Sequence, residues 1–175
     1  MGLDMYLYKK IYIGNDYKKP QEQTTIEIDG VKQERVSEIV ERIAYWRKAN
    51  AIHNWFINNC SENGEDNCQE IYVNREKLEE LLKTVNLVLK SSKLVKGRVY
   101  NGTRHENGKT IKIYEDGLVM DKTEIAKELL PTQEGFFFGD TDYDEYYYRD
   151  LLDTKEMLEK ILKEVDGDFY YQASW

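Results

Sequence analysis

Polar and hydrophobic positions alternate at the start of the chain and later recur with a longer period, which predicts strands followed by helices. Residues 1–13 alternate well enough to predict a strand with one buried face. A polar loop at residues 14–23 follows. Residues 24–28 and 31–35 then flank Asp29-Gly30, a dipeptide typical of two-residue turns, and so predict a β-hairpin.

Hydrophobic residues spaced three or four apart predict helices further along the chain. Ser37 is the expected N-cap of the first helix. Pro131 ends the third, because the residue before a proline avoids helical geometry. Thr141 or Asp142 is the expected cap of the last. The four predicted helices span about residues 37–59, 74–89, 123–130 and 143–165.

Short hydrophobic runs predict the remaining strands, at residues 70–73, 98–100, 110–114, 136–138 and 169–175. Phe136–Phe138 lies between two glycines and is expected to be a buried strand. Because strands and helices mix without regular alternation, we predict a single α+β domain over residues 1–175. Its small mixed or antiparallel sheet would pack against three main helices, with a β-hairpin inserted at residues 96–121.

The composition excludes several classes of protein. No hydrophobic run reaches the roughly 18–20 residues of a membrane helix, and residues 1–30 lack a signal-peptide core. Two cysteines, Cys60 and Cys68, are too few for a disulfide framework or a zinc site. The net charge of −8 argues against direct contact with nucleic acid, which requires clustered lysine and arginine. We expect a cytoplasmic protein without cofactor, metal or membrane contact.

The first candidate site lies on the first predicted helix. Arg47, Asn50 and His53 project from one sector that is otherwise hydrophobic. Arg47 offers planar donors for phosphate or carboxylate, and His53 exchanges protons near neutral pH. With Asp144 and Tyr148 of the last helix they predict the wall of one pocket. In the alternative interpretation these groups tie the helix to neighbouring strands or simply face water, and Asp144 forms a structural salt bridge or a cap.

The second candidate site is an acidic surface near the end of the chain. Residues 140–168 contain eleven Asp or Glu and four Lys or Arg. The excess of acidic residues in this segment accounts for nearly all of the chain's net charge of −8. Tyrosines interleave with the acids, and a tyrosine ring with its polar tip is favoured at protein interfaces. The alternative is a solvated helix face. The candidate contact residues are Asp142, Tyr143, Asp144, Glu145, Tyr146 and Asp150.

Other chemical motifs are absent from the sequence. The acids at 140, 142 and 144 lack the glycine and the distal glutamate of a calcium-binding EF-hand loop. The chain has neither a phosphate-binding glycine loop nor a GxSxG elbow. A catalytic role would therefore rest on His53 with help from a carboxylate.

Several segments resemble a family of small phage and prophage proteins. The resemblance rests on the opening Met-Gly-Leu-Asp-Met-Tyr-Leu, on residues 45–56 with Tyr-Trp-Arg-Lys-Ala-Asn, on 72–82, on 130–141 with Gly-Phe-Phe-Phe-Gly, on 143–154 and on the closing Phe-Tyr-Tyr-Gln-Ala-Ser-Trp. Residues 96–121 depart from the family, which is shorter there. The resemblance implies a phage or prophage origin, and hence the cytoplasm of a bacterial host cell, but no activity.

Two functions follow as hypotheses. The first is a counter-defence inhibitor, similar in action to anti-CRISPR proteins, whose acidic surface occludes a host immune protein such as a nucleic-acid-binding effector. The second is a small-ligand protein whose pocket around Arg47 and His53 sequesters or hydrolyses a nucleotide signal. Exposed Tyr143 and Tyr146 would favour the first hypothesis, and a concave pocket that holds Arg47 would favour the second.

Overall fold

Four antiparallel strands form the central sheet, in the order β4-β1-β8-β5. The computed structural model describes residues 2–106, 108–165 and 167–175. The strands are β1 (Asp4–Tyr12), β4 (Glu38–Arg47), β5 (Ile71–Val73) and β8 (Asp168–Ser174). The first and last strands of the chain are therefore neighbours in the middle of the sheet. Met1, which belongs to the first predicted strand, lies outside the described residues.

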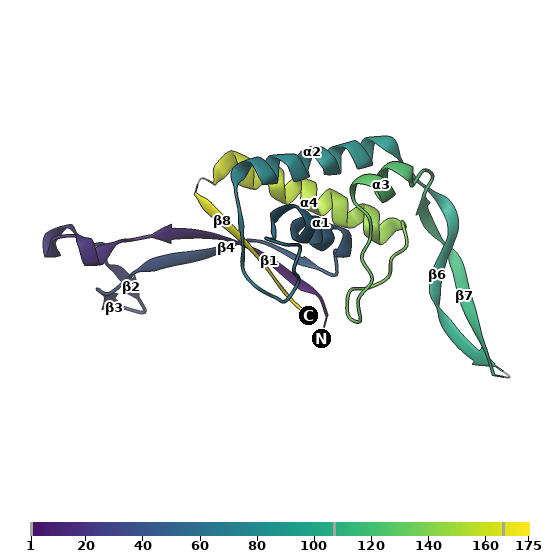
Figure 1. Cartoon of the computed structure of the whole chain (residues 1–175), viewed down its shortest axis with the longest axis horizontal. Coiled ribbons are helices and arrows are strands. Elements are labelled where there is room, and N and C mark those ends of the chain that lie inside the picture. Colours follow the sequence, from purple (N-terminus) through teal and green to yellow (C-terminus); the bar gives the residue numbers. More distant parts are fainter. Residues whose placement is uncertain (1, 107, 166) are drawn as a thin grey trace.

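The helices lie on one side of this sheet (Figure 1). They are α1 (Asn50–Cys60), α2 (Arg75–Ser91), α3 (Glu124–Leu129) and α4 (Glu145–Glu164). Alternate strand residues face them, and Met5, Leu7 and Tyr171 are fully buried there. The Trp46 indole of β4 donates to the Thr154 hydroxyl of α4 at 2.9 Å. This arrangement confirms the predicted α+β class. In the part of the chain that is described, no helix is both long and apolar enough to span a membrane.

The opposite face of the sheet carries tyrosines. Tyr6 pairs with Tyr45 across β1 and β4, and Tyr8 lies opposite Tyr170 of β8. Tyr72 of β5 continues the row and is 54% exposed. Because successive strand residues point to opposite faces, one alternating pattern supplies both the aliphatic core and this tyrosine face.

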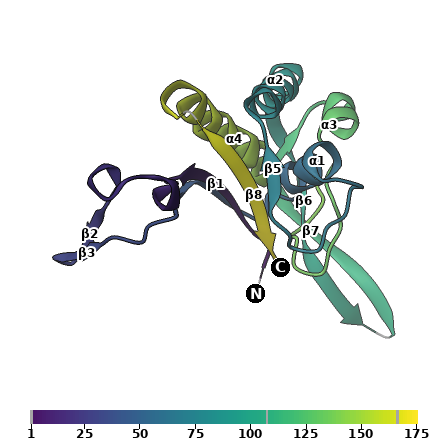
Figure 2. The ribbon, with the colours of Figure 1, turned by 60° about the vertical axis from the view of Figure 1, so that its left-hand side comes forward.

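Two hairpins extend from opposite ends of the molecule (Figure 1), and Figure 2 shows them from a second direction. Their strands are β2 (Ile26–Ile28), β3 (Val31–Gln33), β6 (Leu94–Glu106) and β7 (Lys109–Met120). Both confirm predicted hairpins. Asn101-Gly102, a dipeptide typical of two-residue turns, is instead an irregularity inside β6, where the register shifts between Tyr100 and Thr103. Asn107 lies outside the described residues.

The β6–β7 ribbon is anchored to the rest of the fold at its base. Val119 forms a bridge with Asp144, and the Met120 N–H donates to the Tyr143 carbonyl at 3.0 Å. Further along the ribbon, Ile111 and Ile113 are more than 40% exposed. The distal part of the ribbon therefore contributes little to the buried core.

The first predicted helix is wrong before Asn50, where α1 begins, because residues 38–47 form strand β4 and Ser37 caps no helix. A β-bulge explains the error, because the pairing of β1 with β4 shifts register and leaves Ile43 as an extra residue. The at least partly buried Ile39, Ile43 and Trp46 are consequently spaced four and three residues apart, as they would be on a helix. Arg47 therefore ends a strand.

The buried strand predicted at Phe136–Phe138 is also wrong. The Phe138 N–H donates to the Gly135 carbonyl in a tight turn, and the segment pairs with none of the described strands. Phe138 is buried, whereas Phe136 is 92% exposed. A run of aromatic residues is hydrophobic in either conformation, so its composition did not distinguish a turn from a strand.

The cap of α4 differs from both predicted residues, Thr141 and Asp142. The Asp144 carboxylate accepts hydrogen bonds from the N–H groups of Tyr146 at 2.9 Å and Tyr147 at 3.2 Å. Aspartate is a favoured cap at any of these positions, so the path of the chain before the helix selects Asp144.

Shortening the ribbon should leave the rest of the fold intact. We expect replacement of residues 98–116 by an Asn-Gly turn to change the melting temperature by less than about 4 °C, because that part of the ribbon buries little of the core. Circular dichroism during heating measures this. Loss of a cooperative transition would show that the ribbon is required for folding.

Candidate functional site

A pocket of about 410 Å³ lies where the end of β4, the first turn of α1, the loop before α4 and α4 itself meet. This volume is typical of small-molecule sites. Its apolar lining includes Ala51, Ile52, Tyr147 and Leu151. Its charged lining comprises Arg47, Lys48, Asp140, Asp142 and Asp150.

The cations of this pocket come from the junction between β4 and α1. Lys48 follows the strand with φ of 59°, a left-handed conformation that is uncommon outside glycine. Its N–H donates to the Leu3 carbonyl at 2.8 Å, and its own carbonyl accepts from the Asn50 N–H at 2.8 Å. Gly139, with φ of 92°, packs beside it. Backbone strain of this kind costs roughly 1–3 kcal/mol and is concentrated at functional sites.

Both cationic side chains are exposed and unpaired. Neither the Arg47 guanidinium nor the Lys48 ammonium forms a hydrogen bond or an ion pair with the described residues. Next to them, α1 begins without a side-chain cap and without an acidic residue in its first turn. The first N–H groups of a helix have no partner within it and carry partial positive charge. The junction therefore presents two cations and a positive helix end to the same pocket.

Asn50 shapes the pocket through its buried side chain. The amide nitrogen donates to the carbonyls of Phe138 at 3.1 Å and Asp140 at 2.8 Å. The amide oxygen accepts from the Gln133 N–H at 3.2 Å. These bonds hold the loop before α4 against the start of α1, so Asn50 positions the site and has little hydrogen-bonding capacity left for a ligand.

Asp150 lines the pocket from α4. Its carboxyl group accepts no hydrogen bond and forms no ion pair among the described residues. Burial, and then the nearby carboxylates of Asp153, Asp144 and Asp140, raise the pKa of Asp150 to about 7. The charge of this pocket therefore changes near neutral pH.

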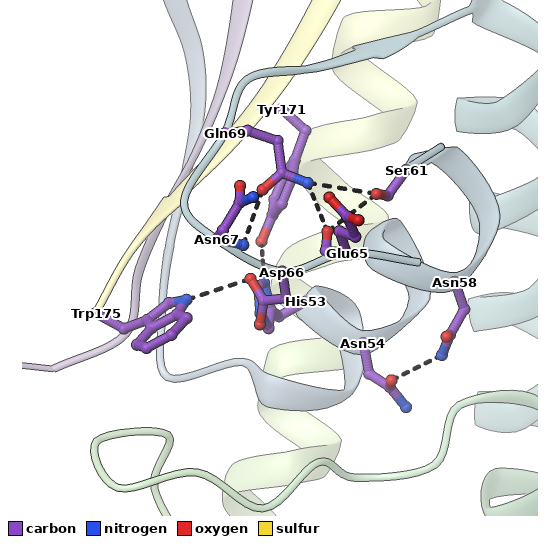
Figure 3. Close-up of polar contacts among 10 residues, drawn as sticks. All are labelled: His53, Asn54, Asn58, Ser61, Glu65, Asp66, Asn67, Gln69, Tyr171 and Trp175. Carbon is purple, nitrogen blue, oxygen red and sulfur yellow. Dashed lines mark hydrogen bonds and ion pairs between the residues drawn. The ribbon is translucent and has the colours of Figure 1, made fainter. Parts of the chain in front are cut away.

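His53, which was predicted to line the same pocket, lies elsewhere in the core. It is fully buried, with Nδ1 2.6 Å from the Tyr171 hydroxyl and Nε2 2.9 Å from Asp66 Oδ2 (Figure 3). The Trp175 indole donates to the other Asp66 oxygen at 3.3 Å. A neutral imidazole that donates from Nε2 accepts at Nδ1, so both nitrogens are satisfied. His53 thus ties the loop at residues 61–69 to α1 and β8, the structural alternative left open by the sequence.

Asp144 is likewise structural. It is buried as the cap of α4, and burial raises the pKa of its carboxyl group. Among the described residues it forms no ion pair with Arg47 or His53. The capping alternative for Asp144 is confirmed.

The tyrosines of the acidic run divide between core and surface. Tyr146 is 63% exposed and lines the pocket. Tyr143 is half-buried, with its ring centre 4.8 Å from that of Tyr147. Tyr148 and Glu145 are half-buried and lie outside the pocket.

The pocket joins the two predicted sites. From the first set it contains Arg47 and Asn50, and from the second set Asp142, Tyr146 and Asp150. The other candidate residues do not line it: His53, Tyr143, Asp144, Glu145 and Tyr148. Lys48 and Asp140 are additional lining residues that the sequence reasoning missed. A left-handed lysine has no sequence signature, whereas Asp140 belonged to the acidic run and offered a signal.

α4 also borders an acidic groove of about 870 Å³ beside the edge strand β4. Its apolar lining includes Ile43, Trp46, Met157 and Ile161. Its acidic residues outnumber its basic ones and are Glu41, Asp150, Asp153, Glu156 and Glu164. Among the described residues of α4, Lys155 and Glu159 form an ion pair at 3.7 Å, and the other carboxylates lack one. Asp166 of the acidic run lies outside the described residues.

The comparisons identify no related protein, and the described residues offer no metal site. No protein-family model, curated protein or solved structure matches the chain. Within residues 2–106, 108–165 and 167–175, no group of three His, Cys, Asp or Glu side chains could hold a metal ion. Burial raises the pKa of the Cys60 thiol to about 11, so this thiol stays protonated near neutral pH.

Asp150→Asn should stabilise the protein at high pH more than at low pH. The raised pKa means that the folded state retains a proton that the unfolded chain releases between the ordinary value of 3.8 and about 7. The contribution of Asp150 to stability therefore falls as pH rises through this window. We expect the variant to melt above the wild type at pH 8 and to lose that advantage at pH 4, as measured by thermal denaturation.

The exposed Glu156→Gln variant is the matched control, and its difference from wild type should vary much less with pH. An advantage of Asp150→Asn that is equal at pH 4 and pH 8 would contradict a raised pKa for Asp150.

Proposed function

We propose that this protein binds a phosphate-bearing nucleotide in the pocket of Arg47, Lys48 and Asp150. The observation that carries this proposal is the pair of unpaired cations beside the uncapped start of α1, inside a pocket of small-molecule size. Arginine offers two parallel donors to phosphate oxygens, lysine adds a point charge, and helix N-terminal amides bind anions.

The rest of the lining suits the other parts of a nucleotide. The exposed ring of Tyr146 offers a stacking surface for a base. The carboxylates of Asp140 and Asp142 accept hydrogen bonds from sugar hydroxyls or from amino groups of a base. Because these carboxylates repel phosphate, they orient the ligand with its phosphate toward Arg47 and Lys48.

The resemblance to phage and prophage proteins favours a role for such binding in counter-defence. Bacterial hosts that use a nucleotide as an infection signal lose that signal when a protein sequesters or hydrolyses it. This is counter-defence by removal of a small molecule, and it needs no contact with nucleic acid.

Arg47→Ala should lower nucleotide affinity by about tenfold to a hundredfold, because a hydrogen bond to a charged group contributes roughly 1.5–3 kcal/mol. Lys48→Asn should act in the same direction without adding strain, since asparagine tolerates positive φ. Calorimetry with the mono-, di- and triphosphates of adenosine, guanosine, cytidine and uridine measures the affinity. Chromatography of the same mixtures reports hydrolysis.

Arg35→Ala is the matched control, because Arg35 is exposed and lies outside the pocket. It should bind nucleotides as the wild type does. The proposal is wrong if no nucleotide in the panel binds the wild type with Kd below about 1 mM.

A second candidate function is favoured by a separate observation, the carboxylates in the acidic groove beside α4 that form no ion pair with the described residues. A groove with acidic and apolar lining residues is complementary to a basic segment of another protein that also carries apolar side chains. We propose, as this second candidate, an anti-CRISPR-like inhibitor that occludes a host immune protein through this surface. An effector whose basic channel normally holds nucleic acid has the complementary charge.

Charge reversal separates the two functions. Asp153→Lys combined with Glu156→Lys should reduce binding to a purified CRISPR effector more than tenfold, because it reverses the charge of two groove residues that do not line the pocket. Interferometry against a panel of effectors measures this. The inhibitor function predicts that Arg47→Ala has a smaller effect, and failure of the wild type to bind any effector in the panel would remove this candidate.

A further inference from the structure

A second hollow, of about 670 Å³, lies between residues 134–142 and the middle of the β6–β7 ribbon. It adjoins the nucleotide pocket, because Gly139, Asp140 and Asp142 line both. One short segment, residues 139–142, thus borders both hollows.

Three exposed aromatic rings line the second hollow. Phe136 is 92% exposed, Tyr114 43% and Tyr100 37%. The rings of Tyr100 and Tyr114 meet across the ribbon with centres 6.0 Å apart at an angle of 68°. Covering an apolar ring that is exposed to water lowers the free energy of the system. A planar ligand covers such rings best.

The polar lining of this hollow favours a base over a phosphate. Glu134, Asp140 and Asp142 contribute three carboxylates, and Lys112 contributes one ammonium, 5.9 Å from the centre of the Tyr100 ring. Carboxylates repel phosphate but accept hydrogen bonds from amino groups of bases. Aromatic side chains stack on the faces of bases whatever their identity.

We infer that the ligand is a dinucleotide, with two bases joined through phosphate. This inference rests on the proposed nucleotide site. The phosphate contacts Arg47 and Lys48, one base lies beside Tyr146, and the other stacks against Phe136 and Tyr114. It gives a role to the β6–β7 ribbon, which forms the outer wall of the second base site and is the region where the chain departs from the phage family it resembles.

Calorimetry with the four 5′-phosphorylated homodinucleotides and the four matching mononucleotides tests this. The wild type should bind at least one dinucleotide about tenfold or more tightly than its mononucleotide, as expected from stacking of one additional base. Phe136→Ala and Tyr114→Ala should remove most of this preference and leave mononucleotide affinity unchanged. Tyr17→Ala is the control, because Tyr17 is 86% exposed and lies outside both hollows.

The variant with residues 98–116 replaced by an Asn-Gly turn gives a second measurement. It should bind mononucleotides as the wild type does and show no dinucleotide preference. Equal wild-type affinity for dinucleotides and mononucleotides overturns the inference and leaves the proposed site standing, whereas absence of all nucleotide binding overturns both. A Phe136→Ala variant that weakens both ligands equally would place Phe136 in the first pocket and also overturn the inference.

Discussion

The buried side chain of Asn50 is the contact on which the candidate site depends. Its amide bonds to Gln133, Phe138 and Asp140, three backbone groups of the loop before α4. A buried polar group left without a partner costs roughly 1–3 kcal/mol, so separating the loop from α1 is unfavourable. The first residue of a helix thereby fixes the position of the loop that contributes Asp140 to the pocket.

The same junction is anchored to the centre of the sheet. Leu3, just before β1, accepts from the Lys48 N–H at 2.8 Å and donates to the Phe137 carbonyl at 3.2 Å. One residue thus contacts both the β4–α1 junction and the loop before α4. Because β1 lies between β4 and β8, the pocket also depends on pairing between the first and last strands of the chain.

Opposite charges share the pocket without neutralising one another. Arg47 and Asp150 line both the pocket and the acidic groove, yet neither forms an ion pair with any residue that the structure describes. The raised pKa of Asp150 and the left-handed Lys48 both carry a cost in stability. Local losses of stability of this kind are typical of ligand-binding sites, where the residues present are not the ones that would make the folded chain most stable.

The amino-acid pattern alone was enough to predict the α+β class, the alternating strands at both ends of the chain and the acidic character of α4. Each of these depends on residues within a few positions of one another. Two features came only from tertiary structure. A bulge at Ile43 gives strand β4 a spacing of hydrophobic residues like that of a helix, and both ring nitrogens of His53 are engaged by Asp66 and Tyr171. Tertiary structure also placed Arg47 and Asp150 in the lining of one pocket. Such pairings join segments far apart in the chain, and contacts between distant segments leave no periodic pattern in a single sequence.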